Sequence, residues 1–357
     1  MSMRNPILDH YEREYGIYFS DAVELAKDEW KHDYHIAMDA QPTLITTPNS
    51  GIPAFLTTIV DPNLLRVLTA KNNATKILEE VRKGDWTMGY AMFPVVESTG
   101  DVSSYGDFNN NGRANANTNF PQRQSYLYQT VPEYGELELE REGLAKINWA
   151  AEVREAGVIV LNKFQNLMYF KGIAGLENYG LQTDPSLPAP IAPSLKSTGV
   201  FSWLNGTAPA ATPNEIFADI QALVNELINQ SNGNIDIESQ MVLGLSPSRL
   251  GAITASNSFG VNVPALIKEN YPKLRLQGAI QYGALTSSNP QGVAVGEQAQ
   301  LIATKVEGQD SGWCAFSEKL RAHPVIRDLS SFRQKLTQGG WGTIVRQPFA
   351  YAQMIGI

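Results

Sequence analysis

The chain has 357 residues, 43% of them hydrophobic and 18% charged, a globular composition with room for two or three compact units. A net charge of −8 argues against a nucleic-acid-binding surface over the whole molecule, because such proteins usually carry a basic excess. Cys314 is the only cysteine, so no intrachain disulfide can form. There is no secretory signal and no apolar run of the roughly 18 residues that a bilayer span needs. We therefore expect a soluble protein, made in the cytoplasm, with no membrane partner.

The first 50 residues are acidic and thinly hydrophobic, with nine acidic and four basic residues. Their pattern predicts one short amphipathic helix at Asp21–Lys31; beyond them a globular pattern begins at Ile52, and a helix opens at Asp61-Pro62. Burial of so few apolar residues cannot offset the conformational entropy lost when residues 1–50 become ordered. We therefore expect this N-terminal arm to be disordered or to lie on another surface. Residues 317–357 carry six bases against two acids. The acidic residues 1–50 and the basic residues 317–357 either attract each other, within or between subunits, or form two separate solvated surfaces.

Residues 86–136 differ in composition from the rest of the chain. Met92–Val96 and Ser125–Val131 read as two strands of one ribbon, because they are rich in residues that favour β-structure. The segment between them, Gly106–Asn119, is rich in Asn and Gly and is typical of a loop. A two-stranded ribbon is marginal in water, so we expect it to lie on its own subunit or on a neighbour.

A long helix is predicted over 148–171, with Asn148 as its N-cap and Gly172 ending it. Its apolar residues predict which face is buried. The expected stripe is Val153, Ala156, Val160, Phe164, Leu167 and Lys171, widened by Gly157, Leu161 and Met168. A proline-rich loop over 179–212 then marks a boundary.

An α/β unit follows this loop and opens with a capping box, in which Thr212 caps, Pro213 takes the first helical position and Glu215 returns the bond. Further elements are expected in chain order. They are strand Met241–Leu245, a helix from Ser246-Pro247 to about Ala255, helix Val263–Tyr271, and strands Lys273–Gln281 and Ala299–Val306. The tail should form three strands, Val325–Leu329, Phe332–Leu336 and Thr343–Met354.

Reactive groups do not converge in any pattern that predicts catalysis. His32 and His35 have a spacing that two metal ligands could share, but no third ligand accompanies them. Cys314 with His323 is a conceivable nucleophile and base, although its apolar neighbours favour a core cysteine. Phosphate-loop, dinucleotide and serine-hydrolase motifs are absent. We predict no catalytic, cofactor-binding or metal site, and no enzyme activity.

Several segments resemble a family of major capsid proteins from tailed bacteriophages and prophages. These segments are Phe93–Gly100, Pro121–Tyr126, Leu161–Asn166, Gly260–Val263, Lys319–Phe332, Trp341-Gly342 and Arg346–Phe349. The resemblance runs from about Pro48 to the end of the chain, and Lys319–Phe332 is its most specific part. It implies an α+β fold, the Hong Kong 97-like major capsid protein fold.

That resemblance also implies a domain plan and a set of partners. The plan is an N-terminal arm (1–50), a peripheral domain (51–85, 137–212 with its long spine helix, and 312–357), an extended β-hairpin loop (86–136) and an axial α/β domain (213–311). The implied partners are further copies of the chain, as homohexamers and homopentamers of an icosahedral shell, and packaged double-stranded DNA held without sequence-specific contacts. Portal protein, and scaffolding or decoration proteins, are further implied partners. The implied place is the virion, assembled in the bacterial cytoplasm.

The type member of this fold crosslinks its shell through a lysine in the extended loop. Here no lysine lies between Lys83 and Lys146, and the sequence begins at Met1, so we expect neither that crosslink nor removal of an N-terminal scaffolding segment. Two structural alternatives are an encapsulin-like compartment with protein cargo and a tail or baseplate protein. The alternative from another class is a hydrolase with a non-standard site.

Overall fold

The computed structural model describes residues 72–357 apart from 146–147, 255 and 257–261. The chain divides into two compact units, Met1–Pro62 and Asn63–Ile357, and the described residues belong to the second. The predicted helix at Asp21–Lys31, the helix at Asp61-Pro62, and His32 and His35 lie outside the described residues.

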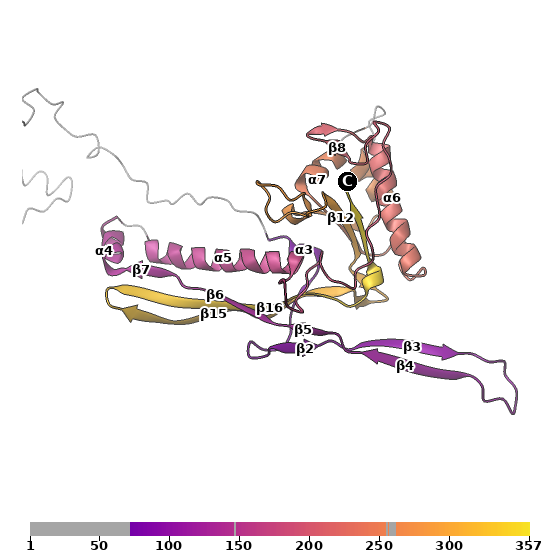
Figure 1. The fold of residues 1–357 in the computed structure, drawn as a ribbon, viewed down its shortest axis with the longest axis horizontal. Helices are drawn as coiled ribbons and strands as arrows, with labels where there is room; N and C mark the ends of the chain where they lie inside the picture. The colour runs from indigo at the N-terminus through magenta and orange to yellow at the C-terminus, as the bar shows by residue number, and fades with distance from the viewer. Residues whose placement is uncertain (1–71, 146–147, 255, 257–261) are drawn as a thin grey trace, which may run out of the picture. The chain divides into compact units, whose positions relative to one another are not determined.

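The first sheet of the described chain has five strands and is built around one long hairpin (Figure 1). Its strands run in the order β1–β15–β16–β6, with β7 also paired to β16. Their bounds are β1 (Glu80–Arg82), β6 (Tyr126–Thr130), β7 (Glu133–Gly135), β15 (Gly312–Asp328) and β16 (Ser331–Val345). Two predicted tail strands are therefore parts of a single hairpin with several β-bulges. The short helix α3 (Ala74–Ile77) leads into β1, and α4 (Glu136–Ala145) follows β7.

Helix α5 (Trp149–Lys171) covers one face of this sheet (Figure 1). Both predicted ends are confirmed, because the Asn148 side chain accepts a hydrogen bond from the Ala151 backbone and Gly172 caps the other end. The helix approaches the sheet so closely at Gly157 that a Cβ there would lie 3.2 Å from Leu336. A larger residue at this point of contact would require the side chains of Pro132 and Leu336 to shift by a few tenths of an ångström.

The predicted buried stripe on α5 is confirmed at Gly157, Leu161 and Met168, but its predicted centre is wrong. Val160 is 57% exposed and Ala156 is exposed, whereas Phe164 and Leu167 are half-buried. The buried residues are Gly157, Leu161, Gln165, Asn166, Met168, Tyr169 and Phe170. At about 100° per residue, this face lies roughly a quarter turn from the predicted one. The reason is that polar Gln165 and Asn166 are buried through hydrogen bonds, which hydrophobicity alone does not indicate.

The second sheet has four strands in the order β11–β10–β12–β17. Its strands are β10 (Met241–Leu245), β11 (Leu274–Gly278), β12 (Gln298–Ala303) and β17 (Tyr351–Ile355), and its helices are α6 (Pro213–Gln230), α7 (Pro247–Ile253) and α8 (Val263–Asn270). The remaining short elements are the turns η2 (Ile280–Tyr282) and η3 (Pro348–Ala350). Two separate two-stranded sheets pair β8 (Leu204–Asn205) with β9 (Ala208–Pro209) and β13 (Lys305–Val306) with β14 (Gln309–Asp310). The helices α6, α7 and α8 and the strands β10, β11 and β12 confirm the elements predicted for this part of the chain.

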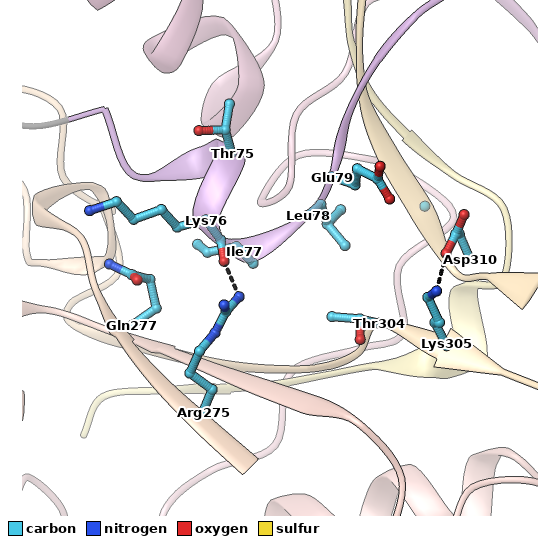
Figure 2. A pocket seen from close by; sticks show the side chains of 11 residues that line it. Thr75, Lys76, Ile77, Leu78, Glu79, Arg275, Gln277, Thr304, Lys305 and Asp310 are labelled. Carbon is cyan, nitrogen blue, oxygen red and sulfur yellow. Dashed lines mark hydrogen bonds and ion pairs between the residues drawn. The ribbon is translucent and has the colours of Figure 1, made fainter. Parts of the chain in front are cut away.

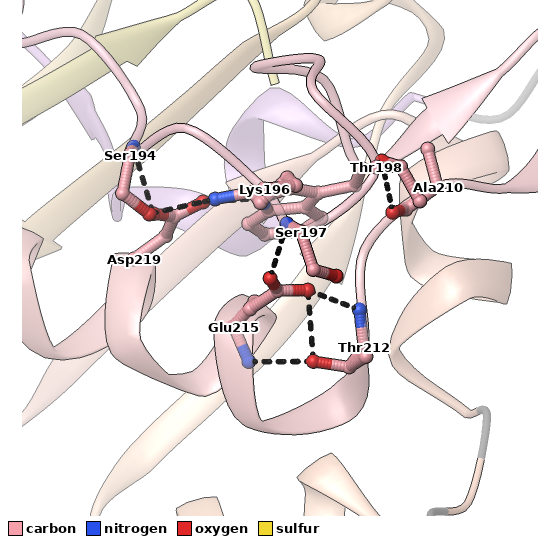
Figure 3. A network of polar contacts seen from close by, with 9 residues as sticks. Ser194, Lys196, Ser197, Thr198, Ala210, Thr212, Glu215 and Asp219 are labelled. Atoms are coloured by element: carbon pink, nitrogen blue, oxygen red, sulfur yellow. Dashed lines mark hydrogen bonds and ion pairs between the residues drawn. The ribbon is translucent and has the colours of Figure 1, made fainter.

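The capping box at the start of α6 is confirmed, with both reciprocal hydrogen bonds between Thr212 and Glu215. Figure 3 shows the polar network beside it. The buried Asp219 carboxylate accepts a hydrogen bond from Lys196 Nζ at 2.5 Å and from Trp203 Nε1 at 2.7 Å, and Ser194 donates to its other oxygen. This network fastens the proline-rich loop 179–212 to α6.

The predicted single strand Thr343–Met354 is wrong. Strand β16 ends at Val345, the turn η3 begins at Pro348, and β17 then pairs with β12 in the second sheet. Pro348 has no N–H to donate to a ladder, so the break in the strand falls where the sequence carries a proline. The last strand of the chain therefore joins the α/β unit.

The ribbon within 86–136 also differs from the prediction. Its long strands are β3 (Val95–Asp101) and β4 (Arg113–Asn119), with a short pair β2 (Tyr90–Met92) and β5 (Gln122–Gln124) at its base. Ser125–Val131 does not pair with Met92–Val96, because it forms β6 against β16. The predicted loop is half strand, since the alternating polar run Arg113–Asn119 pairs with β3.

Candidate functional site

Cys314 and His323 do not form a catalytic pair. Both lie on β15, nine residues apart, which along a strand is roughly 30 Å. Burial raises the pKa of the Cys314 thiol to about 12, so the nucleophilic thiolate is disfavoured. His323 instead contacts the Thr337 hydroxyl at 3.2 Å. The expectation of a core cysteine is confirmed, since Cys314 is fully buried.

A cleft of about 500 Å³ lies between α3 and the edge of the second sheet (Figure 2). Three of its charged residues contact other parts of the chain, since Arg275 donates to the Lys76 carbonyl and Lys305 lies 3.9 Å from Asp310. Within the described residues, no three His, Cys, Asp or Glu side chains are grouped so as to hold a metal ion. The cleft supplies no convergent reactive groups.

The β3–β4 ribbon is the most exposed element of the described chain. Every residue of both strands is exposed, and so are the residues of the tip, 102–112. Large apolar side chains are among them, including Val102, Tyr105 and Phe108. Exposed apolar groups that gather in one element mark an interaction surface in a soluble protein.

The base of the ribbon is held firmly to the body of the chain. Arg123 of β5 forms a 2.8 Å ion pair with the buried Asp184 and lies over the Tyr179 ring. Next to it, Asn178 donates to the carbonyls of Gln124 and Gly340. A buried, charge-assisted contact of this kind fixes the place from which the ribbon leaves the body.

The two faces of the ribbon differ in chemistry, because side chains alternate along each strand. The apolar face carries small or apolar groups at the paired positions, namely Val96, Ser98, Gly100, Ala114, Ala116 and Thr118. The polar face carries Val95, Glu97, Thr99, Asp101, Arg113, Asn115, Asn117 and Asn119. Val96 is 63% exposed, and Phe120 just after β4 is 55% exposed.

The first sheet has one covered face and one open face. Leu336 and Gln338 of β16 contact α5, and the neighbouring Tyr128 of β6 contacts Phe164 of α5. The residues between them on each strand therefore point away from α5. This open face comprises Leu127, Gln129, Arg333, Lys335 and Thr337. The residues on the same face of the neighbouring strands include Arg321, Ile326 and the acids Glu133, Glu318 and Asp328.

Most of the basic residues near the C-terminus already have carboxylate partners. Arg333 pairs with Glu133 and Asp328, Arg327 with Glu136, and Arg321 with Glu318. The acidic arm, which either attracts these bases or is a separate solvated surface, lies outside the described residues. Any contact with it competes with these ion pairs, except at Lys335, for which no ion pair exists within the described part of the chain.

Solved structures similar to this chain include phage and GTA capsids. The capsid of Myoviridae phage XM1 matches with a TM-score of 0.67 at 13% identity, over 87% of this chain and 100% of that chain. The capsid of an empty GTA particle matches at 0.54 and 11% identity, over 86% and 99%. A Gordonia phage Cozz structure matches at 0.51 and 13%, over 88% and 98%. At these identities the likeness concerns the fold, which is of the Hong Kong 97 type.

The sequence itself shows which family the chain belongs to. Residues 43–356 match the model of the family described as Pa193 gp26 major capsid protein. The chain belongs to this family of major capsid proteins. No curated protein matches the sequence. Among the described helices, none is long and apolar enough to cross a membrane.

Proposed function

We propose that this chain assembles with copies of itself into hexamers and pentamers that close an icosahedral head around double-stranded DNA, and that it works as a structural protein without enzymatic activity. The observation that supports this most strongly is the β3–β4 ribbon, which is exposed along its whole length in a member of a capsid protein family. A ribbon without a core of its own gains stability once a neighbouring copy covers it.

The proposed division of the chain keeps most of the domain plan. Residues 1–50 are the arm, 51–85 and 137–212 the peripheral domain, and 213–311 the axial domain. Two amendments follow from the strand pairing. The extended loop ends at β5, since β6 and β7 pair with β16, and β17 joins the axial sheet rather than the peripheral one.

Besides further copies of the chain, the proposed partners are packaged DNA and other proteins of the particle. Packaged DNA is held without sequence-specific contacts, and a portal protein occupies one vertex. Scaffolding or decoration proteins are additional partners, and assembly takes place in the cytoplasm of the bacterial host. The chain would then carry no catalytic, cofactor or metal site.

The test is to purify the full chain and examine it by negative-stain microscopy, followed by nuclease treatment and recovery of protected nucleic acid. We expect closed shells of uniform size, and DNA protected in particles from infected or induced cells. Closed shells that enclose a protein cargo instead of DNA would support the encapsulin-like alternative. Tubes, discs or small discrete particles would contradict the proposal.

A further inference from the structure

The sequence contains three asparagines that are followed directly by glycine. They are Asn111, Asn205 and Asn232. In such a pair the backbone nitrogen of the glycine can approach the side-chain amide of the asparagine closely, because glycine has no Cβ to obstruct it. All three pairs are exposed to solvent. Exposure therefore does not distinguish them, and any difference in their chemistry must come from the hydrogen bonds around each pair.

The pair Asn111-Gly112 lies at the tip of the ribbon, directly before β4 (Figure 1). Within the described residues, no hydrogen bond engages the Gly112 N–H or the Asn111 side chain. The nearby Asn109 is held instead, since its amide donates to the Ser104 carbonyl at 2.8 Å and its side-chain oxygen accepts from the Asn111 N–H at 3.1 Å. The Asn111 amide is therefore free to turn toward the peptide that follows it.

The backbones of the other two pairs are held in place. After α6, the Gly233 N–H donates to the Ile228 carbonyl at 3.1 Å. A backbone nitrogen engaged in this way is a poor nucleophile, because it must lose the proton that makes the hydrogen bond. Asn205 belongs to β8 and is paired with Ala208 of β9, so the hairpin fixes its backbone in an extended conformation.

We infer that Asn111 is a site of spontaneous deamidation. The Gly112 nitrogen gives its proton to water and attacks Cγ of Asn111, so that a new C–N bond closes a five-membered imide ring. The bond from Cγ to the side-chain nitrogen breaks, and that nitrogen leaves as ammonia. Water then adds to one of the two ring carbonyls and opens the ring, which leaves aspartate or isoaspartate at position 111. Water is the only co-reactant of the two steps.

The reaction changes the charge of the ribbon tip. The charged residues of 101–113 are two acids, Asp101 and Asp107, and one base, Arg113, so the net charge of this segment is −1. A carboxylate at position 111 makes it −2, on an element that is exposed throughout. The tip therefore becomes more acidic as the protein ages. This inference concerns the single chain and does not depend on the proposed self-assembly.

Peptide mapping of the aged protein tests the inference. The purified full chain is incubated at pH 6.5 and at pH 8.5, digested, and analysed by fragmentation mass spectrometry, which assigns the converted residue. In the folded chain we expect Asn111 to convert at least fivefold faster than Asn205 or Asn232, and faster at pH 8.5 because the attacking nitrogen must lose a proton. In guanidinium chloride that unfolds the chain, the three rates should agree within about twofold, since all three are followed by glycine.

Two glycines of the tip provide a matched pair of variants. A Cβ at Gly112 would lie 3.4 Å from Ser103, and a Cβ at Gly106 would lie 3.4 Å from Asn109, so the fold accommodates alanine at both positions. We expect Gly112→Ala to slow the conversion of Asn111 at least tenfold, because the new Cβ obstructs ring closure. Gly106→Ala should change it less than twofold.

Three results would overturn the inference. The first is conversion at Asn111 in the folded chain that is no faster than at Asn205 or Asn232. The second is an unchanged rate at Asn111 in Gly112→Ala, or an equal decrease in Gly106→Ala. The third is a ranking of the three sites that persists in the unfolded chain, since the folded tip would then have no part in it.

Discussion

Asp219 accepts hydrogen bonds from Lys196, Trp203 and Ser194 while almost fully buried, and it is the kind of residue that a sequence does not reveal. Lys196 lies in a loop that the sequence marks only as proline-rich, 23 residues before its partner. A buried ion pair depends on the tertiary fold, so no local pattern predicts it. The capping box of Thr212 and Glu215 was predictable, because both partners lie within one turn.

The Glu215 carboxylate should make the stability of the fold decrease at acidic pH. Hydrogen bonds from the backbone of Thr212 and Ser197 lower its pKa to about 2 from an ordinary value of 4.5. A lowered folded pKa gives stability that is fully present above the ordinary value and is lost as the pH falls through about 2. We predict that Glu215→Gln lowers the melting temperature at pH 7. The melting temperatures at pH 5 and pH 2.5 should also differ less in the variant than in the parent. An identical acid dependence in the variant and the parent would contradict this role.

Adjacent residues on α5 test which side of the helix is buried. Leu161 is 2% exposed against the first sheet, whereas Val160 faces away from it. Leu161→Ala should cost about 2–5 kcal/mol of unfolding free energy, and Val160→Ala less than about 0.5 kcal/mol. Urea unfolding of the two variants measures both values. Equal losses of unfolding free energy in the two variants would mean that Val160 is buried, as the sequence predicted.

Elements were predictable to the extent that their signals are local. The ends of α5, the α/β unit and the break at the proline-rich loop all follow from caps, periodicity and proline. The ribbon was predictable as an extended segment but not in its pairing, because Arg113–Asn119 is poor in residues that favour strands. Pairing with β3 overrides that low propensity, and the long-range pairing of β6 with β16 has no local signal.

The ribbon should be dispensable for folding and needed for assembly. Replacing residues 95–119 with a short glycine–serine link joins Pro94 to Phe120, where Phe93 already bonds to Pro121 at 3.0 Å. Because every removed residue is exposed, we expect the melting temperature to change by no more than about 2 °C. Microscopy should show no closed shells. Shells of normal size from this variant would exclude the ribbon as an assembly element.

At the scale of the whole molecule, two elements of the chain have surfaces that no other part of the described chain covers. The ribbon is exposed throughout, and the sheet beneath the spine-like helix α5 has one open face. The family was recognisable from the sequence, because its motifs are spread along nearly the whole chain. The surfaces through which we propose that copies meet were not predictable from the sequence, because a contact between copies leaves no local pattern in one chain.

Particles of this protein should come apart into single chains under denaturing electrophoresis. The ribbon and its base contain no lysine, since none lies between Lys83 and Lys146, so no ribbon amine can form an amide with a neighbour. We expect one band at the mass of the chain, 39.2 kDa, from mature particles boiled in detergent. A ladder of covalent multiples that survives reduction would contradict a shell held by noncovalent contacts.

The central claim is that copies of this chain form a closed shell through overlapping ribbons, and cryo-electron microscopy of purified particles tests it most directly. We expect icosahedral particles with five- and sixfold capsomers, in which the density for β3–β4 leaves each subunit and contacts a neighbouring copy. Closed particles whose ribbons fold back on their own subunit, or lie free in solvent, would contradict it.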